Sequence, residues 1–247
     1  MPQGTLSVRT LARVCVLSPD LVVAVLAAGA SRRLGCAKQL VPIAGEPLLR
    51  RQCRCALNAA VGDVVAILGC DEAHHRKVIV DLPLDVRVND EWTEGLAATL
   101  RSAVRIARVR RAALLVLSCD QYRVTPGDLR TLHDRWRLVP WTACVSRWRD
   151  YAGPPAILPV QYHEDVLALR GDIGARALFY RSRLPRPQEV SNPRATFDID
   201  VQEDMRIAQT WAACQVSVSY DENRTGGRDR DCPLRSRQPE REVGWVS

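Results

Sequence analysis

Short apolar runs alternate with amphipathic stretches through most of the chain. The apolar runs at residues 21–26, 64–68 and 112–117 predict buried strands, and residues 86–88 and 142–146 predict further strands. The amphipathic stretches predict helices that begin near residues 48, 71, 95 and 125. Strands without polar alternation, separated by helices, are typical of a mostly parallel sheet with helices on both faces. We therefore expect a three-layer α/β fold.

The alternation of apolar runs and amphipathic stretches changes from about Gly153 onward. Gly153, Pro154 and Pro155 predict a loop, and two helical stretches after it are interrupted around residues 171–174. We interpret this part as a substrate-facing insertion. The sequence FDID at residues 197–200 predicts a strand that ends in acids, followed by a last helix to about Ala213.

Three segments are expected: a lead-in at residues 1–20, one domain at 21–214, and a tail at 215–247. With 47% hydrophobic residues among 247, the chain has ample material for a core. Beyond Ser219 the tail is charged and almost free of large apolar side chains, which predicts disorder.

Composition restricts the environment and the partners. No apolar run approaches the roughly 18 residues of a membrane span, and nine cysteines without a CxxC pair favour a reducing cytoplasm. Arg9 and Arg13 before an apolar stretch imitate a signal peptide, but cleavage there would remove the segment described next. The net charge of +7 comes with two Phe and five Tyr, so we expect anionic small molecules rather than nucleic acid.

The segment Leu26–Leu40, LAAGASRRLGCAKQL, carries the clearest chemistry. A glycine-rich turn after a buried strand exposes backbone N–H groups, and a following helix adds its positive end, which together favour an anion. Arg32, Arg33 and Lys38 add charge. The spacing fits neither GxxxxGK[ST] nor GxGxxG. We therefore expect a polyphosphate site of another type.

Asp120 follows the apolar strand at residues 112–117, where an unpaired carboxylate is costly. Two interpretations remain open: a helix cap or salt bridge to Arg123, or a Mg²⁺ ligand. Asp198 or Asp200, expected on one face of a strand, would supply a second carboxylate. Two acids beside an anion loop suit nucleotidyl transfer, in which the metal neutralises charge on the phosphates.

These motifs resemble a known family. Leu26–Leu40 resembles the signature LAAGxSxRxGxxKxL of nucleotidyltransferases. Further motifs narrow the resemblance to the molybdenum cofactor cytidylyltransferases over about residues 21–210: PxxGxPLL from Pro42, NxxWxxGLAxxL from Asn89, LxCDQ from Leu117, GxPA from Gly153, GDxGAR from Gly171, and DID with ED at 198–204.

The resemblance implies a Rossmann-like nucleotidyltransferase fold and transfer of CMP from CTP to the phosphate of molybdenum-bearing molybdopterin. The LAAG form, with Ala28, implies CTP. Implied nucleotide ligands are Ala27, Ala28, Gly29, Ser31, Arg33, Lys38, Gly95 and Thr99, with Arg33, Lys38 and Asp120 catalytic. Implied Mg²⁺ ligands are Asp120 and Asp200, and implied pterin contacts are Gly153, Pro155, Ala156, Gly171, Asp172 and Arg176. A molybdoenzyme or its chaperone is the implied protein partner.

Several alternatives stay open. The same reaction could use another nucleoside triphosphate or another phosphorylated acceptor, or the chain could be a redox, accessory or cofactor-holding relative. The missing dinucleotide fingerprint argues against a redox role. Four positions depart from the family pattern: Thr99 replaces Ser, Tyr122 replaces Pro, and Val201 and Gln202 replace Thr-Pro.

Overall fold

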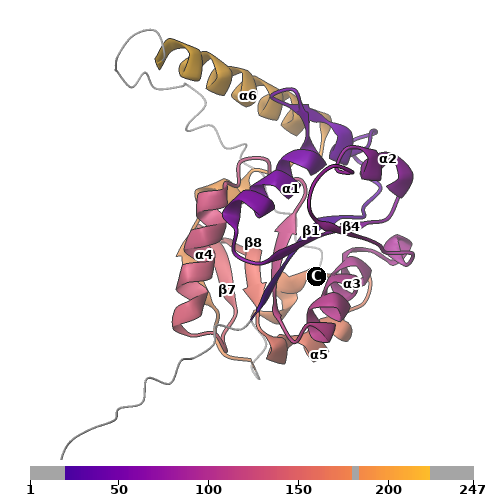
Figure 1. Cartoon of the computed structure of the whole chain (residues 1–247), viewed down its shortest axis with the longest axis vertical. Helices are drawn as coiled ribbons and strands as arrows, with labels where there is room; N and C mark the ends of the chain where they lie inside the picture. Colours follow the sequence, from indigo (N-terminus) through magenta and orange to yellow (C-terminus); the bar gives the residue numbers. More distant parts are fainter. Residues whose placement is uncertain (1–19, 180–183, 223–247) are drawn as a thin grey trace, which may run out of the picture.

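The structure is a computed structural model that describes residues 20–179 and 184–222 (Figure 1). The predicted lead-in, apart from Asp20, and the part of the predicted tail after residue 222 lie outside these residues. The described elements form the expected α/β architecture, with one large sheet between two layers of helices (Figure 1).

A seven-stranded sheet runs through the centre of the molecule. Its order is β5 (Asp85–Val88), β4 (Asp63–Leu68), β1 (Leu21–Ala27), β6 (Ala113–Ser118), β8 (Tyr151–Leu158), β7 (Cys144–Trp148) and β9 (Gln188–Ser191). β5, β4, β1 and β6 pair in parallel, β8 is antiparallel to both its neighbours, and β7 and β9 are parallel. A small hairpin joins β2 (Pro42–Ile43) to β3 (Glu46–Pro47). The mostly parallel sheet predicted from the apolar runs is confirmed.

Helices cover both faces of the sheet. They are α1 (Leu48–Ala59), α2 (Glu72–Lys77), α3 (Leu96–Val109), α4 (Pro126–Leu138), α5 (His163–Leu167) and α6 (Gln202–Glu222). In β1, Val23 and Val25 pack with side chains of α1, α4 and α6, whereas Val22 and Ala24 pack with those of α3 and α5. This alternation follows from the two-residue period of a strand, so a wholly apolar β1 supplies both cores.

The predicted loop at Gly153–Pro155 is instead the middle of strand β8. Its ladder with β7 shifts register between Val145 and Ser146, opposite the two prolines, where a missing N–H does not break a regular ladder. Ser146 Oγ donates to Pro155 O at 2.8 Å and holds the irregular stretch. Glycine and proline in the sequence marked a bulge here rather than a loop.

The predicted strand at residues 197–200 is also wrong. β9 lies earlier, and residues 193–196 form a 3₁₀ turn before an irregular segment that carries Asp198 and Asp200. The argument that both acids share one strand face therefore fails. The Asp204 carboxylate accepts the backbone N–H groups of Asp200 and Val201 and fixes the start of α6.

The last helix is longer than predicted. α6 continues to Glu222, past the expected end at Ala213 and past the expected domain boundary at residue 214. The physical reason is visible in the sequence, since residues 211–222 contain neither Gly nor Pro to end a helix. The predicted tail thus begins inside an ordered helix.

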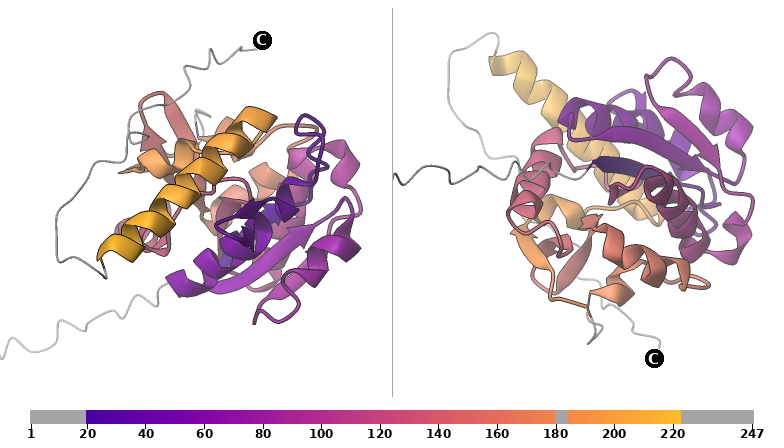
Figure 2. Two further views of the ribbon diagram at one scale, coloured as in Figure 1. Left: turned by 90° about the horizontal axis from the view of Figure 1, so that it is seen from above. Right: turned by 60° about the horizontal axis from the view of Figure 1, so that its bottom comes forward.

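An aromatic cluster attaches α6 to the domain. The ring of Tyr122, a buried residue, meets the rings of Trp211 and Phe197 edge to face, with centroids 5.5 and 6.4 Å apart. The guanidinium of Arg123 lies 3.7 Å from the Phe197 ring centroid and stacks on that ring. The salt bridge between Arg123 and Asp120 that the sequence left open is therefore absent. Arg51 of α1 lies 5.8 Å from the Trp211 ring, and Figure 2 shows α6 beside α1.

Replacing Trp211 by alanine should lower the free energy of unfolding by about 2–3 kcal/mol, because the cluster loses its largest ring and leaves a cavity. Urea denaturation of the purified protein measures this change. Thr210→Ala, one position away on the exposed side of α6, should change stability by less than about 0.5 kcal/mol. Equal stability of the two variants would mean that α6 is not held by this cluster.

Candidate active site at the carboxyl ends of the strands

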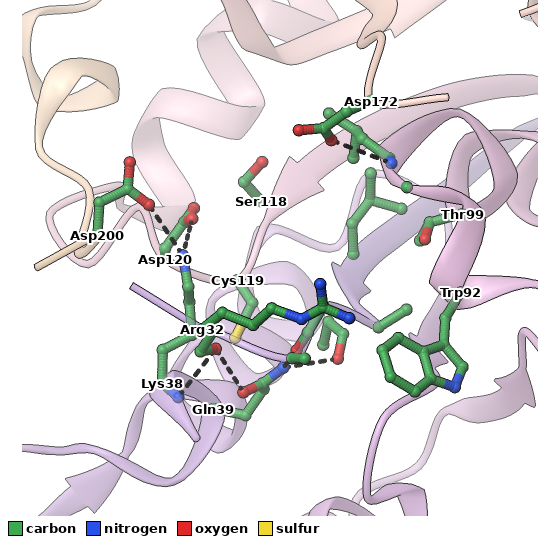
Figure 3. A pocket seen from close by; sticks show the side chains of 18 of the residues that line it. Arg32, Lys38, Gln39, Trp92, Thr99, Ser118, Cys119, Asp120, Asp172 and Asp200 are labelled. Carbon is green, nitrogen blue, oxygen red and sulfur yellow. Dashed lines mark hydrogen bonds and ion pairs between the residues drawn. The ribbon is translucent and has the colours of Figure 1, made fainter. Parts of the chain in front are cut away.

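A pocket of about 530 Å³ opens beyond the carboxyl ends of β1 and β6 (Figure 3). Such ends are where ligands bind in open α/β sheets. Three segments supply most of the lining: the loop after β1, the turn before α3, and residues 118–120 after β6. Asp172 and Asp200 complete the lining from later parts of the chain.

The loop after β1 is held by its own side chains. Gln39, a buried residue, donates from Nε2 to Ala27 O at 3.0 Å and to Gly29 O at 2.7 Å. The backbone N–H of Lys38 donates to Ser31 Oγ at 3.2 Å. Gly35 has a φ of +76°, which favours glycine. The loop is therefore folded back on itself before any ligand arrives.

Ala27, Ala28, Gly29, Ser31 and Arg33 all line the pocket, as the resemblance implies. Gln39 also lines it, although nothing in the sequence singled it out. The residues around Gln39 show no helix or strand periodicity that would indicate a buried side chain. Its two acceptors lie at least ten residues earlier in the chain, so the hydrogen bonds depend on how the loop folds.

Lys38 lies between two carboxylates. Its Nζ is 2.9 Å from Asp120 Oδ2 and 3.1 Å from Asp200 Oδ1 (Figure 3). Arg33 Nη2 is 3.3 Å from Asp200 Oδ2. The Lys38 side chain is 17% exposed and each of these carboxylates 23%. The cationic partner expected for Asp120 is thus Lys38, and three distant segments meet at one charged cluster.

Burial lowers the pKa of Lys38, but the charges and hydrogen bonds of Asp120 and Asp200 outweigh burial and raise the pKa well above its ordinary value. Lys38 is therefore an ammonium group at physiological pH. Because the pKa is raised in the folded protein, this contribution to stability is complete below about pH 10, the range of a free lysine, and is lost as pH rises through the raised value.

The pH profile of catalysis tests this assignment. We expect kcat/KM to show no lysine ionisation between pH 7 and about 10, because Lys38 keeps its proton throughout. The measurement is pyrophosphate release over this range, with thermal unfolding followed in parallel. An alkaline decline below pH 10 that disappears in Lys38→Arg would contradict the raised pKa.

The carboxylates fit a divalent cation. Asp120 and Asp200 converge on one point, at present the position of Lys38 Nζ, and both border the pocket that the loop after β1 lines. Two carboxylates with phosphate and water oxygens form a donor set that suits Mg²⁺ or Mn²⁺. Within residues 20–179 and 184–222, no group of three or more His, Cys, Asp or Glu side chains is arranged to hold a metal. Further ligands would come from a substrate and water.

The turn before α3 forms the opposite wall. Trp92, Gly95 and Thr99 line the pocket, and Thr99 Oγ1 accepts from Asn89 Nδ2 at 3.3 Å. Trp92, the tryptophan of the motif that begins at Asn89, faces the pocket (Figure 3). At Gly95 a Cβ atom would lie 2.8 Å from the carbonyl carbon of Gly171, so this position has no room for a side chain.

Of the six residues expected to contact a pterin, one lines the pocket and five do not. Asp172 lines the pocket (Figure 3), and its Oδ1 accepts from the N–H of Leu96 at 3.3 Å. Gly153, Pro155, Ala156, Gly171 and Arg176 are not among the residues that line it. Three of these five lie within β8.

Gln121 links β8 to the charged cluster. Its Nε2 donates to Pro154 O and to Ala195 O, each at 2.7 Å. It follows Asp120 directly, and Ala195 precedes the segment that carries Asp200. Gln121 therefore holds the two acid-bearing segments and the irregular part of β8 together.

Comparison with known proteins assigns the family. The model of the MobA-like NTP transferase domain matches residues 23–186, which is more than half of the chain. The chain belongs to the MobA-like NTP transferase family. It is a nucleotidyltransferase, and the matched residues include the loop after β1, the turn before α3 and Asp120, all of which line the pocket.

Individual relatives agree with this family. "Purine catabolism protein PucB" of Bacillus subtilis is 27% identical over 175 residues, which cover 68% of this MobA-like chain and 84% of PucB. The structure of Rv0371c from Mycobacterium tuberculosis is 28% identical with a TM-score of 0.70, covering 78% of this chain and 98% of Rv0371c. A further Rv0371c structure is a complex with manganese.

A more distant structure shows the fold alone. Molybdopterin-guanine dinucleotide biosynthesis protein A from Archaeoglobus fulgidus is 19% identical with a TM-score of 0.60, covering 78% of this chain and 99% of that protein.

Among the helices in the described part of the chain, none is long and apolar enough to cross a membrane.

Proposed function

We propose that the protein transfers CMP from CTP to the terminal phosphate of molybdenum-bearing molybdopterin and releases pyrophosphate. The observation that carries this proposal is the convergence of Lys38, Asp120 and Asp200 beside the loop after β1, in one pocket with Gly95 and Thr99. That arrangement supplies the cations for a triphosphate, the carboxylates for a metal, and a separate wall for the base.

The reaction needs little from the protein beyond binding and alignment. An oxygen of the acceptor phosphate attacks the α-phosphorus of CTP, and the bond from that phosphorus to the bridging oxygen breaks, so pyrophosphate leaves with the electron pair. The nucleophile is already an anion, and no general base is required. Arg33, Lys38 and the N–H groups of the loop after β1 bind the β- and γ-phosphates and fix the line of attack.

Asp120 and Asp200 would hold the Mg²⁺ ion, which neutralises charge on the α-phosphate and on the departing pyrophosphate. Lys38 Nζ lies within 3.1 Å of both carboxylates and offsets their charge. The ammonium group therefore reduces the repulsion between Asp120 and Asp200.

CTP as the nucleotide is supported by the LAAG form of the loop after β1. Ala28 is buried, its carbonyl oxygen accepts from the N–H of Cys70 at 3.0 Å, and its Cβ would lie 2.8 Å from a Cβ at Gly69. Ala28 thus has a fixed position, and its Cβ occupies space that a side chain at Gly69 would need. Molybdopterin as the acceptor is supported by the GDxGAR motif, whose Asp172 lines the same pocket.

The proposal is tested by supplying each of the four nucleoside triphosphates with Mg²⁺ and either molybdenum-bearing or metal-free molybdopterin. Pyrophosphate and the dinucleotide product are measured, the latter by mass spectrometry. We expect product with CTP and the molybdenum-bearing acceptor. Faster reaction with GTP would overturn the choice of nucleotide, and absence of pyrophosphate in every mixture would overturn the acceptor.

We further propose that the product passes to a molybdoenzyme or to its chaperone. The family resemblance described under the sequence motifs is the support for such a recipient.

A further inference from the structure

An ion pair behind the pocket wall joins two loops of the site. Arg101 of α3 is buried, with a side chain that is 6% exposed, and it is not among the residues that line the pocket. Its Nη1 donates to Glu94 Oε1 at 2.7 Å and to Leu169 O at 2.9 Å. Its Nη2 contacts Glu94 Oε2 and donates to Glu91 Oε2 at 3.0 Å. The guanidinium thus spans the turn before α3 and the loop that begins at Leu169.

Glu94 extends this connection to the second loop. Its Oε1 also accepts the backbone N–H of Gly171 at 3.1 Å. The hydrogen bond from Arg101, followed by that from Gly171, lowers the pKa of Glu94 to about 2. The carboxylate is therefore charged at every pH at which the enzyme would work, and the bridge is a charge-assisted one.

Two further hydrogen bonds join the loop at residues 169–172 to the start of α3. Gly171 O accepts the N–H of Ala97 at 3.0 Å, and Asp172 Oδ1 accepts the N–H of Leu96. The absence of a side chain at Gly95 lets the backbone at Gly171 approach this closely. Figure 3 shows Asp172 near the start of α3, across the pocket from Asp120 and Asp200.

The two loops lie side by side in the wall opposite the charged cluster. Residues 92–95 and Thr99 form part of this wall, and the loop at 169–172 adds Asp172 to it. In-line transfer requires the attacking oxygen to lie about 3–3.5 Å from the α-phosphorus, so the position of this wall relative to the charged cluster decides whether a bound acceptor can react. A residue that fixes this spacing acts on the acceptor without touching it.

We propose that Arg101 is a positioning residue which, through Glu94, holds the loop at residues 169–172 against the turn at residues 92–95 and thereby sets acceptor binding. Only the identity of the acceptor rests on the proposed function. If Arg101 only stabilised α3, its replacement would speed amide exchange throughout α3 and raise the KM values of both substrates equally. A positioning role predicts local changes in residues 169–176 and in the acceptor KM alone.

The experiment compares Arg101→Lys with Arg105→Lys in the full chain. Lysine keeps the charge but cannot reach Glu91, Glu94 and Leu169 together. Arg105 is the matched control: it lies on the same helix, is exposed, and has Nη1 3.9 Å from Glu91 Oε2 without a contact to the second loop. Glu94→Gln is a milder second variant, which keeps an acceptor for Gly171.

Hydrogen exchange and steady-state kinetics are the two readouts. Arg101→Lys should speed amide exchange in residues 169–176 while peptides from β1 and β6 exchange as in the parent protein. With CTP and molybdenum-bearing molybdopterin, the acceptor KM should rise about 10- to 100-fold, whereas the CTP KM stays within about twofold. Arg105→Lys should change neither, and Glu94→Gln should show a smaller effect of the same kind.

Unchanged exchange in residues 169–176 in both Arg101→Lys and Glu94→Gln would overturn the proposal, as would equal increases in both KM values or faster exchange throughout α3. If the parent protein does not use molybdopterin, the proposed acceptor is wrong, and the exchange experiment still decides whether Arg101 holds the loop. Localised faster exchange would then support the positioning role on its own.

Discussion

Asp120→Asn and Asp200→Asn are each expected to reduce turnover about 10³-fold, because each removes one of two carboxylates that converge on a single point, and a metal contributes several kcal/mol to such a transition state. The measurement is pyrophosphate release at saturating CTP and Mg²⁺. The change is nearly isosteric, so the fold should be retained, which circular dichroism checks.

Asp198→Asn is the matched control for this pair. Asp198 lies two residues from Asp200 in the same irregular segment but is not among the residues that line the pocket. Most of the activity should therefore remain in this variant. Full Mg²⁺-dependent turnover in Asp120→Asn and Asp200→Asn, with loss in Asp198→Asn, would show that the metal ligands had been assigned to the wrong acids.

Lys38→Ala is expected to slow transfer about 100-fold, because a charge-assisted contact to the triphosphate is lost. The same variant should bind Mn²⁺ more tightly than the parent protein when no nucleotide is present. Lys38 Nζ lies where the carboxylates of Asp120 and Asp200 converge. Its removal takes away the ion pair of Asp120 and leaves Asp200 with Arg33 alone, which leaves more negative charge for a cation. Titration of free Mn²⁺ by electron paramagnetic resonance measures the change.

A control for this variant is unusually simple. The chain has two lysines among 35 basic residues, and the other, Lys77, is exposed on α2. Lys77→Ala should leave both transfer and Mn²⁺ binding as they are. Weaker Mn²⁺ binding in Lys38→Ala, together with unchanged CTP affinity, would contradict the assignment of Lys38 to the phosphates and to the acid pair.

The parallel part of the fold was predictable because its strands are buried on both faces. Residues 21–27 and 113–117 are apolar throughout, which excludes a surface segment at either place. β8 was missed because Pro154 and Pro155 suggest a loop, and only the neighbouring strand β7 supplies the register shift that accommodates them. Local sequence cannot specify a bulge that depends on its partner strand.

The site was predictable to a similar extent. The charge of Asp120 after an apolar strand required a cation, yet Lys38, which lies 82 positions earlier, meets it only through the tertiary fold. The sequence did not indicate a role for Arg101 either. Its acceptors come from the turn before α3 and from Leu169, whereas the periodicity of a helix shows only which side faces the core. Pairings across long separations were the part that sequence reasoning could not reach.

The segment shared with the family ends at residue 186, whereas Asp200 and the whole of α6 follow it. The side chain of Gln202, at the first position of α6, donates to Leu34 O at 2.6 Å, so this helix also supports the loop after β1. A chain shortened to the shared segment would keep Asp120 and lose the second acid. With the metal-binding role proposed for Asp200, a gene fusion that keeps activity would join after α6 rather than directly after the shared segment.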